Sequence, residues 1–317
     1  MTIGILLTNI GTPTAPTPHA VRRYLQEFLS DKRIVPLPSL LWKPLLQCLI
    51  LPRRKKSSAE LYQKIWTEQG SPLLVLSERL KIALQEQLQR PVALGMRYGR
   101  PRIKEALREL QAQNVERVLI FPLYPQYSTT TTASVFDVIA TLLKNGSYLP
   151  EVRAMNDYAR EPLYIKAVAL TIEQYWQTHE QAHLLFSFHG IPEQLATRDP
   201  YASLCRYTAE AISQELKLKP NEWTLAFQSR IGPKKWLTPY TADVLRTLPR
   251  QGIKEVHVIC PGFAVDCLET LEEIALRGRK QFLQAGGNIF HYIPALNDHL
   301  LHVEILKQFI TRQIQGW

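Results

Sequence analysis

Residues 184–192 have the sequence LLFSFHGIP, and residues 5–13 have the sequence ILLTNIGTP. Each is a short apolar run followed by a glycine and a proline, which is typical of a buried strand that ends in a tight loop. Later segments of the two halves also correspond, since GMRYGRP at 95–101 matches FQSRIGP at 227–233. The chain therefore repeats one order of strand, loop and helix, and this repeat predicts two similar lobes.

Six apolar runs fit buried strands, and most of them precede a loop and an amphipathic helix. The runs lie at residues 3–8, 92–96, 117–121, 183–188, 224–227 and 256–260. Helices are expected at 101–111 and 239–248, each with a proline near its start. Strands that alternate with helices predict an α/β fold, with parallel sheets covered by helices on both faces.

The repeat divides the chain into an N-terminal lobe at residues 1–155 and a C-terminal lobe at 156–317, which we expect to face each other across a cleft. Equivalent glycines at 11 and 190 are 179 residues apart, but equivalent prolines at 101 and 233 are only 132 apart. The first lobe therefore carries an insertion, at about 30–75. The last helical segment, at 298–314, is expected to pack back on the first lobe.

The insertion contains an apolar stretch, IVPLPSLLWKPLLQCLIL at 34–51, followed by four basic residues at 53–56. Prolines and Lys43 interrupt the stretch, so a membrane-spanning helix is not expected. One interpretation is an exposed apolar lip whose basic neighbours meet anionic lipid headgroups. The other is an ordinary buried helical hairpin, and the pattern leaves both open.

The composition limits the class of protein. The chain has 317 residues, of which 45% are hydrophobic, and a formal net charge of +10, which suits an anionic partner. Its basic residues mostly alternate with acids along helical segments, so no nucleic-acid partner is expected. The N-terminus lacks the basic region of a signal peptide, and the cysteines lack metal or redox spacing. Both features predict buried thiols in a reducing cytoplasm, at Cys48, Cys205, Cys260 and Cys267.

His189 directly follows a predicted strand. Ligands of open parallel sheets bind at the carboxyl ends of the strands, so this side chain is placed to face the cleft. Histidine is a common metal ligand and a base that titrates near neutral pH. Position alone is equally consistent with a structural histidine.

An acidic row lies in the segment 259–274. Asp266, Glu269 and Glu273 are spaced i, i+3 and i+7 and are expected on one helical face. Interaction with the helix dipole explains why acids occur at the first two positions, near the start of the helix. It explains Glu273 poorly, because Glu273 lies two turns into the helix. One histidine with carboxylates suits a loosely held divalent metal of the first transition row, and not a closed zinc site.

Two further loops combine aromatic with polar side chains. Tyr127 precedes a run of hydroxyl residues, and Gln228, Ser229 and Arg230 lead into a Gly-Pro pair and Trp236. Arg97 and Tyr98 follow another predicted strand. Such side chains suit a flat apolar pocket that also holds carboxylates. No glycine-rich phosphate motif occurs, so a nucleotide site is not expected.

Together these segments resemble the ferrochelatases. SFHGIP, FQSRIGP, YPQYS and the acidic row occur in the order of that family, and the likeness runs from about residue 5 to about residue 274. The resemblance implies two similar Rossmann-like lobes of the chelatase kind with a porphyrin cleft between them. It also implies a lyase that inserts ferrous iron into protoporphyrin IX in the last step of haem biosynthesis, with iron as substrate and no tightly bound cofactor.

The resemblance also implies roles for residues, motif by motif. His189 and Glu269 correspond to the catalytic and metal-binding pair, while Asp266 and Glu273 correspond to a path for metal or protons. The porphyrin-facing positions of the family correspond to Arg97, Tyr98, Tyr127 and Ser71. Whether His189 accepts protons or binds iron is left open.

Members of the family with an iron–sulfur cluster hold it with cysteines in a C-terminal extension, and the last cysteine here is Cys267. No iron–sulfur cluster is therefore expected. The alternatives are a coproporphyrin ferrochelatase, another tetrapyrrole metal chelatase, and a non-catalytic porphyrin or haem carrier. The expected location is the cytoplasm, with contact to the inner face of the cytoplasmic membrane, and protein partners are left open.

Overall fold

A computed structural model describes residues 2–146, 150–232 and 234–317. The chain divides into two compact units. Unit 1 comprises Met1–Leu123, Thr129–Asn156 and Asp298–Trp317, and unit 2 comprises Tyr124–Ser128 and Asp157–Asn297. The main crossing from unit 1 to unit 2 falls at Asn156, beside the boundary that the sequence repeat suggests.

Unit 1 contains a parallel four-stranded sheet in the order β2-β1-β3-β4. The strands are β1 (Ile3–Thr12), β2 (Val92–Gly99), β3 (Arg117–Pro122) and β4 (Glu151–Ala154). The central strand β1 is buried along almost its whole length, and its Leu7 pairs with Leu94 on one side and Phe121 on the other. Continuous apolar runs of this kind are expected where helices cover both faces of a parallel sheet.

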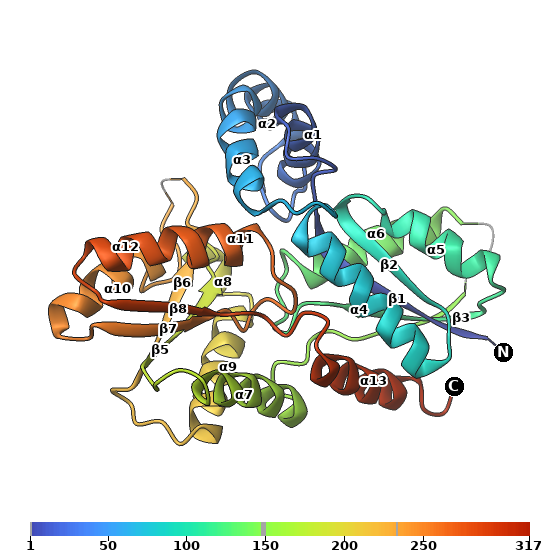
Figure 1. The fold of residues 1–317 in the computed structure, drawn as a ribbon. Coiled ribbons are helices and arrows are strands. Elements are labelled where there is room, and N and C mark those ends of the chain that lie inside the picture. The colour runs from blue at the N-terminus through green and yellow to red at the C-terminus, as the bar shows by residue number, and fades with distance from the viewer. Residues whose placement is uncertain (1, 147–149, 233) are drawn as a thin grey trace. The chain divides into compact units, whose positions relative to one another are not determined.

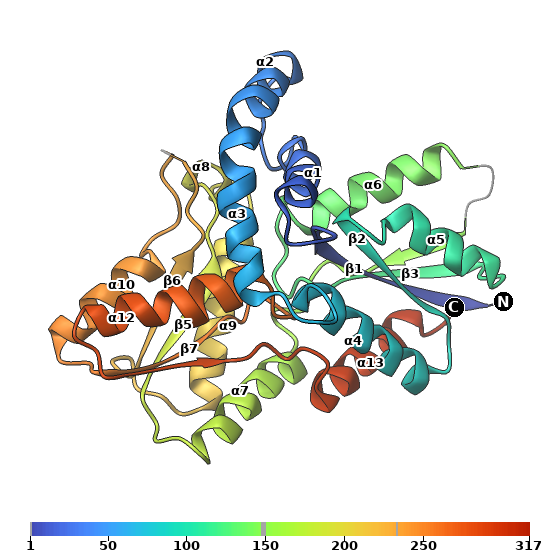
Figure 2. The ribbon, with the colours of Figure 1, turned by 45° about the horizontal axis from the view of Figure 1, so that its top comes forward.

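Helices cover both faces of this sheet (Figures 1 and 2). In Figure 2, α5 and α6 lie over one face, and α4 and α13 lie over the other. The last helix packs on α4 and β3, both of unit 1. The four helices are α4 (Pro72–Leu88), α5 (Ile103–Ala112), α6 (Thr132–Lys144) and α13 (Leu300–Ile314).

The insertion forms a helical projection of unit 1, preceded by α1 (Pro18–Leu29). It consists of α2 (Ser39–Leu45), the π-helix η1 (Leu46–Ile50) and α3 (Leu51–Ile65), and α3 packs against α1. Leu40 is 90% exposed and Leu41 is 74% exposed, so the interpretation as a buried hairpin is wrong for this end of the insertion. Within the described part of the chain, no helix has the length and apolar character needed to span a bilayer.

Unit 2 repeats the topology of unit 1. Its parallel sheet has the order β6-β5-β7-β8, which is the order of the first sheet shifted by four strands. The strands are β5 (His183–His189), β6 (Trp223–Gln228), β7 (Glu255–Ile259) and β8 (Ile289–Ile293). The predicted α/β fold of two similar lobes with parallel sheets is therefore confirmed.

Helices flank the second sheet as well. Figure 1 shows α7 and α9 on one face, with α10 and α12 on the other. Leu185, Val256 and Phe282 form part of the core beneath α10 and α12. The helical segments are α7 (Pro162–Trp176), α8 (Glu193–Ala196), α9 (Tyr201–Glu215), α10 (Thr241–Thr247), η2 (Leu248–Gln251), α11 (Leu268–Thr270), η3 (Leu271–Gly278) and α12 (Arg279–Gln284).

The glycines of the two repeated motifs have a steric explanation. Gly11 has a φ of +99°, and a Cβ there would lie 1.8 Å from the carbonyl oxygen of Tyr98. A Cβ on Gly190 would lie 2.9 Å from the carbonyl oxygen of Gln228. In each unit the chain leaving the first strand passes directly against the neighbouring strand, and only glycine leaves room for this approach.

Candidate active site

Three strands of unit 2 end at the same edge of the sheet. His189 is the last residue of β5 and pairs with Gln228, the last residue of β6, while the loop after β7 leads into α11. The chain reverses its direction of travel across the sheet between β5 and β7. The carboxyl ends of strands at such a switch point are where open α/β sheets bind ligands.

His189 is half-buried, and its ring nitrogen Nδ1 lies 2.6 Å from the carbonyl oxygen of Gly190. A carbonyl can only accept a hydrogen bond, so we assign a proton to Nδ1. In the neutral imidazole, Nε2 then carries a lone pair that can accept a proton or bind a metal. The ring centroid of Phe263 lies 6.4 Å from that of His189, so an aromatic neighbour borders this side chain.

The acidic row does not have the predicted geometry. The helix begins at Leu268, with Cys267 as its N-cap, so Asp266 lies outside it. Only Leu268–Thr270 is α-helical, and the segment Leu271–Gly278 is a π-helix. The prediction that all three acids share one face of a regular helix is therefore wrong.

Asp266 anchors the start of this helix. It is 4% exposed, and its carboxylate accepts hydrogen bonds from Thr270 Oγ1 at 2.8 Å, from Asn297 Nδ2 at 2.7 Å and from the hydroxyl of Tyr292. Burial raises the pKa of Tyr292, and the adjacent Asp266 carboxylate raises it further. The predicted place of Asp266 in a path for metal or protons stays a prediction, and the structure gives this side chain little exposed surface.

Glu273 is held by the residue that follows β6. The backbone N–H of Ser229 donates to Glu273 Oε1 at 2.8 Å, and the Ser229 hydroxyl donates to Oε2. Ser229 has a φ of 66°, in the left-handed region that few residues other than glycine occupy. In this conformation the backbone N–H and the hydroxyl of Ser229 both donate to the carboxylate of Glu273.

Two buried thiols border the acids. Burial raises the pKa of Cys267, and the charge of Glu269 and a hydrogen bond to its carboxylate raise it further. Burial likewise raises the pKa of Cys260, followed by the charges of Asp266 and Glu273. Both groups therefore remain neutral thiols near neutral pH, and Cys267 supplies a weak donor beside Glu269. Cys205 is also buried, whereas Cys48 is exposed, so the prediction of a buried thiol is wrong there.

Metal binding was predicted for His189 and Glu269. Within the described ranges, no group of three or more histidine, cysteine, aspartate or glutamate side chains is arranged to hold a metal ion. The metal-binding roles of His189 and Glu269 stay predictions.

Arg97 and Tyr98 belong to unit 1 and share one polar cluster. Arg97 donates to Asp31 and to Ser134 Oγ at 2.6 Å, and the Tyr98 hydroxyl donates to Asp31 at 2.7 Å. Burial alone would raise the pKa of Asp31, but hydrogen bonds from Ser134, the Arg33 backbone and Tyr98, together with the Arg97 charge, hold it below its ordinary value. Tyr98 is only 1% exposed, so its contact with porphyrin stays a prediction.

The other two predicted porphyrin residues, Ser71 and Tyr127, have different surroundings. Ser71 is 3% exposed, precedes α4 and shares a 2.8 Å hydrogen bond with Thr12. Tyr127 is half-buried and belongs to unit 2. Its neighbours Gln126 and Ser128 are buried and bonded to Thr208 and Asp199.

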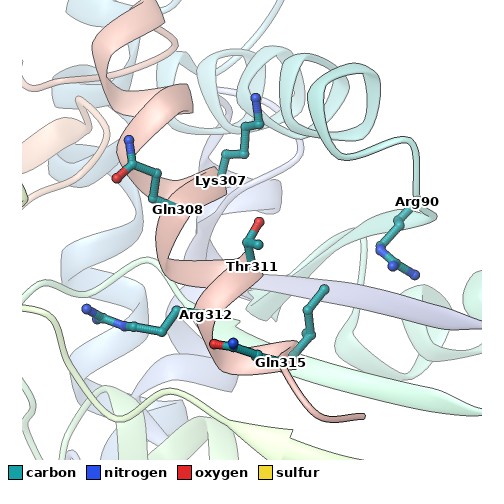
Figure 3. Close-up of a pocket in the computed structure, with 7 residues that line it drawn as sticks. Arg90, Lys307, Gln308, Thr311, Arg312 and Gln315 are labelled. Carbon is teal, nitrogen blue, oxygen red and sulfur yellow. The ribbon is translucent and has the colours of Figure 1, made fainter.

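Figure 3 shows a separate surface hollow in unit 1. Arg90 borders it at one side, and the rest of its lining comes from the C-terminal part of the chain. Those residues are Lys307, Gln308, Thr311, Arg312, Ile314 and Gln315. None of them belongs to the predicted site, and the hollow carries no carboxylate or histidine, so we do not assign the chemistry to it.

Gln228 and Ser229 were expected to lie in a pocket-lining loop, but their bonds to the acidic row were not predicted. Their signal was present in the sequence, because polar side chains directly after an apolar strand mark the ligand-binding edge of a sheet. The supporting partners Tyr292 and Asn297 carry no such signal, since they come from β8 and the loop after it.

Comparisons with known proteins agree with the motifs. The family model described as Ferrochelatase matches residues 2–314. The chain is 49% identical to Ferrochelatase 1 of Shewanella oneidensis over 99% of its own length and 96% of that protein. It is 51% identical to the ferrochelatase of Pectobacterium atrosepticum, with 98% of each chain covered.

Solved structures with much lower identity share the fold. SirB from Bacillus subtilis, in a structure with Fe3+, superposes with a TM-score of 0.57 at 10% identity, over 100% of this chain and 97% of that one. CbiX, described as the terminal enzyme for siroheme biosynthesis in denitrifying bacteria, gives a TM-score of 0.52 at 15% identity, over 99% and 100%. These likenesses show a chelatase-like α/β fold.

Proposed function

The chain belongs to the ferrochelatase family, which inserts ferrous iron into porphyrin, and we propose that His189 and Glu269 act directly on the iron and the ring protons. The observation that carries this proposal is the 2.6 Å distance from His189 Nδ1 to the Gly190 carbonyl oxygen, from which we assign the lone pair of the neutral ring to Nε2. Insertion of Fe2+ releases two protons from the pyrrole nitrogens and changes no oxidation state. Nε2 suits proton acceptance or iron binding, and Glu269 supplies an oxygen ligand or a second base.

Replacement of His189 by alanine tests the assignment. His189→Ala should keep the circular dichroism spectrum and lose at least about 100-fold in kcat, the usual worth of a positioned acid–base group. His183→Gln is the matched control, because His183 lies at the opposite end of the same strand and is bonded to Thr224. Normal turnover by folded His189→Ala would refute the assignment.

The two remaining acids of the row should differ in effect. Glu269 lies in the first turn of the helix, whereas both oxygens of Glu273 are already bonded to Ser229. We expect Glu269→Gln to collapse kcat and Glu273→Gln to change mainly the dependence on iron concentration. An active Glu269→Gln beside an inactive Glu273→Gln would reverse the two roles.

We propose protoporphyrin IX as the porphyrin, taken up at a membrane surface. Exposed Leu40 and Leu41 on α2, near the basic residues of α3, support this proposal. An apolar surface beside positive charge is what binding to anionic lipid requires. The enzyme would then be cytoplasmic and peripheral on the inner face of the cytoplasmic membrane.

Co-sedimentation with anionic liposomes tests the membrane contact. The double variant Leu40→Ser/Leu41→Ser should lose binding, while Leu300→Ser should keep it, because Leu300 is 80% exposed but lies on α13. Equal binding by both variants would exclude the lip as the contact.

Absorption spectra during incubation with Fe2+ and each porphyrin test the substrate. Faster metallation of protoporphyrin than of coproporphyrin is expected. Faster metallation of coproporphyrin would favour a coproporphyrin ferrochelatase. If the protein metallates only another tetrapyrrole with another metal, it is a related chelatase. If it binds porphyrin without inserting a metal, it is a carrier.

A further inference from the structure

Gln228 is a buried glutamine whose amide is bonded at both ends. It is 3% exposed, and its Nε2 lies 2.7 Å from the backbone carbonyl oxygen of Glu269. Its Oε1 lies 2.7 Å from Ser187 Oγ and 3.5 Å from Cys260 Sγ. The side chain therefore joins β5, β6 and the end of β7 to the first turn of the acidic helix.

The direction of these bonds follows from the groups involved. The Glu269 carbonyl can only accept, so the NH2 group of Gln228 must face it and Oε1 must face Ser187. Ser187 then donates to Oε1 and accepts from Thr241 Oγ1, which lies 2.8 Å away. Ser187 is 0% exposed and Thr241 is 2% exposed, so solvent does not compete for this chain of hydrogen bonds.

The backbone of Gln228 is bonded to the loop that carries the histidine. His189 and Gln228 are partners in the parallel pairing of β5 with β6, and the Gly190 N–H donates to the Gln228 carbonyl at 2.8 Å. Gly190 is also the residue whose carbonyl sets the His189 tautomer. One residue thus bonds to both sides of the site, by its backbone on the histidine side and by its side chain on the glutamate side.

We propose that Gln228 is the positioning residue that fixes Glu269 relative to His189. This inference rests on the proposed roles of His189 and Glu269. The amide holds the backbone of Glu269, two residues before Leu271, where the helix changes from α to π winding. π-helical turns are rare and occur mostly at functional sites, and the carbonyl that Gln228 binds lies just before one.

The expected effect follows from the demands of positioning. A misplacement of ~1 Å costs about 100-fold in rate when reacting groups must be aligned. Gln228→Met keeps the length of the side chain and removes the donor to Glu269. We expect kcat to fall at least about tenfold with KM for porphyrin within about twofold of wild type.

Thr241→Val is the matched control. It removes one buried hydroxyl from the same chain of hydrogen bonds, yet leaves the bond from Gln228 to Glu269 in place. It should lower the melting temperature as Gln228→Met does and keep kcat within about twofold. If Gln228→Met fails to fold, Gln228→Asn replaces it in the test, because the asparagine side chain is too short to reach the Glu269 carbonyl. The same loss of kcat is expected for this variant.

A double-variant cycle separates this inference from the proposed function. If Gln228 acts through Glu269, then Gln228→Met should leave the residual rate of Glu269→Gln unchanged. If Gln228→Met lowers kcat of the Glu269→Gln variant as much as it lowers kcat of the wild type, the positioning role is wrong. Equal losses of kcat in Gln228→Met and Thr241→Val would also overturn it. Normal activity of Glu269→Gln alone would instead overturn the proposed function.

Discussion

Replacement of His257 should remove an acid-sensitive contribution to the stability of unit 2. His257 lies on β7, is 1% exposed, and accepts a hydrogen bond at Nδ1 from the indole N–H of Trp176 at 2.9 Å. The ring centroids of His291 and His179 lie 5.2 Å and 6.4 Å away. Since the indole can only donate, protonation of His257 at both nitrogens breaks this bond and places a charge beside two other imidazoles.

The magnitude follows from the pKa. Burial, followed by the neighbouring His291 and His179, lowers the pKa of His257 from 6.5 to about 4. The unfolded chain therefore binds a proton more readily than the folded one. As the pH falls from 6.5 to 4, the free energy of unfolding should decrease by about 1.4 kcal/mol per pH unit, or about 3 kcal/mol in all. Below pH 4 and above pH 6.5 this group contributes no further change.

Denaturant unfolding at several pH values between 7.5 and 4 measures this contribution. His257→Phe loses the acceptor for Trp176 and should be less stable than wild type at pH 7.5, by about 1–3 kcal/mol. Its stability should then fall less steeply with acid, so that the difference closes near pH 4. Val258→Ala, at a fully buried neighbour on β7, should lower stability equally at every pH. Parallel pH curves for wild type and His257→Phe would refute the reasoning, as would an NMR titration of His257 near pH 6.5.

Three further outcomes are expected. Asp266→Ala leaves buried Thr270 and half-buried Tyr292 and Asn297 without their shared acceptor and should lower the free energy of unfolding by about 3 kcal/mol. A melting temperature within about 2 °C of wild type would contradict its anchoring role. Arg97→Met leaves the Asp31 carboxylate, whose side chain is 7% exposed, without its cation and should lower the free energy of unfolding by about 3 kcal/mol. Adding Asp31→Asn to this variant should restore part of that free energy, as measured by denaturant titration. The purified protein should show no iron–sulfur absorption and keep its melting temperature in chelator, and stoichiometric acid-labile sulfide would contradict this.

Both sheets were largely predictable, because their strands are covered on both faces and are therefore nearly continuous apolar runs. All six predicted runs lie in strands of the structure or reach one residue beyond them. The sequence analysis missed β4 and β8, the edge strands of the two sheets. No residue of β4 is buried, and only Phe290 and Ile293 of β8 are, so neither has the apolar run that marks a central strand.

The polar residues near the strand ends were predictable in position but not in partnership. Arg97 and Tyr98 follow from their place in β2, yet their common partner Asp31 lies more than 60 residues earlier in the chain. Nothing local marks Asp31 as that partner, because it lies in a loop beside Lys32 and Arg33. The sequence therefore identified candidate ligands for a porphyrin carboxylate without showing that unit 1 supplies a carboxylate of its own.

The acidic row shows where reasoning from local periodicity stops. A spacing of i, i+3 and i+7 places three acids on one face only if every turn has α-helical winding. Here the first acid precedes the helix, and the winding widens at Leu271. The bonds that accompany this geometry come from distant residues. Gln228 at the end of β6 binds the backbone of Glu269, and Ser229 just after β6 binds Glu273. Asn297 binds Asp266 from beyond β8. Because these partners lie some 30 to 45 residues away in sequence, the helical spacing could select these acids as candidates but could not predict their geometry.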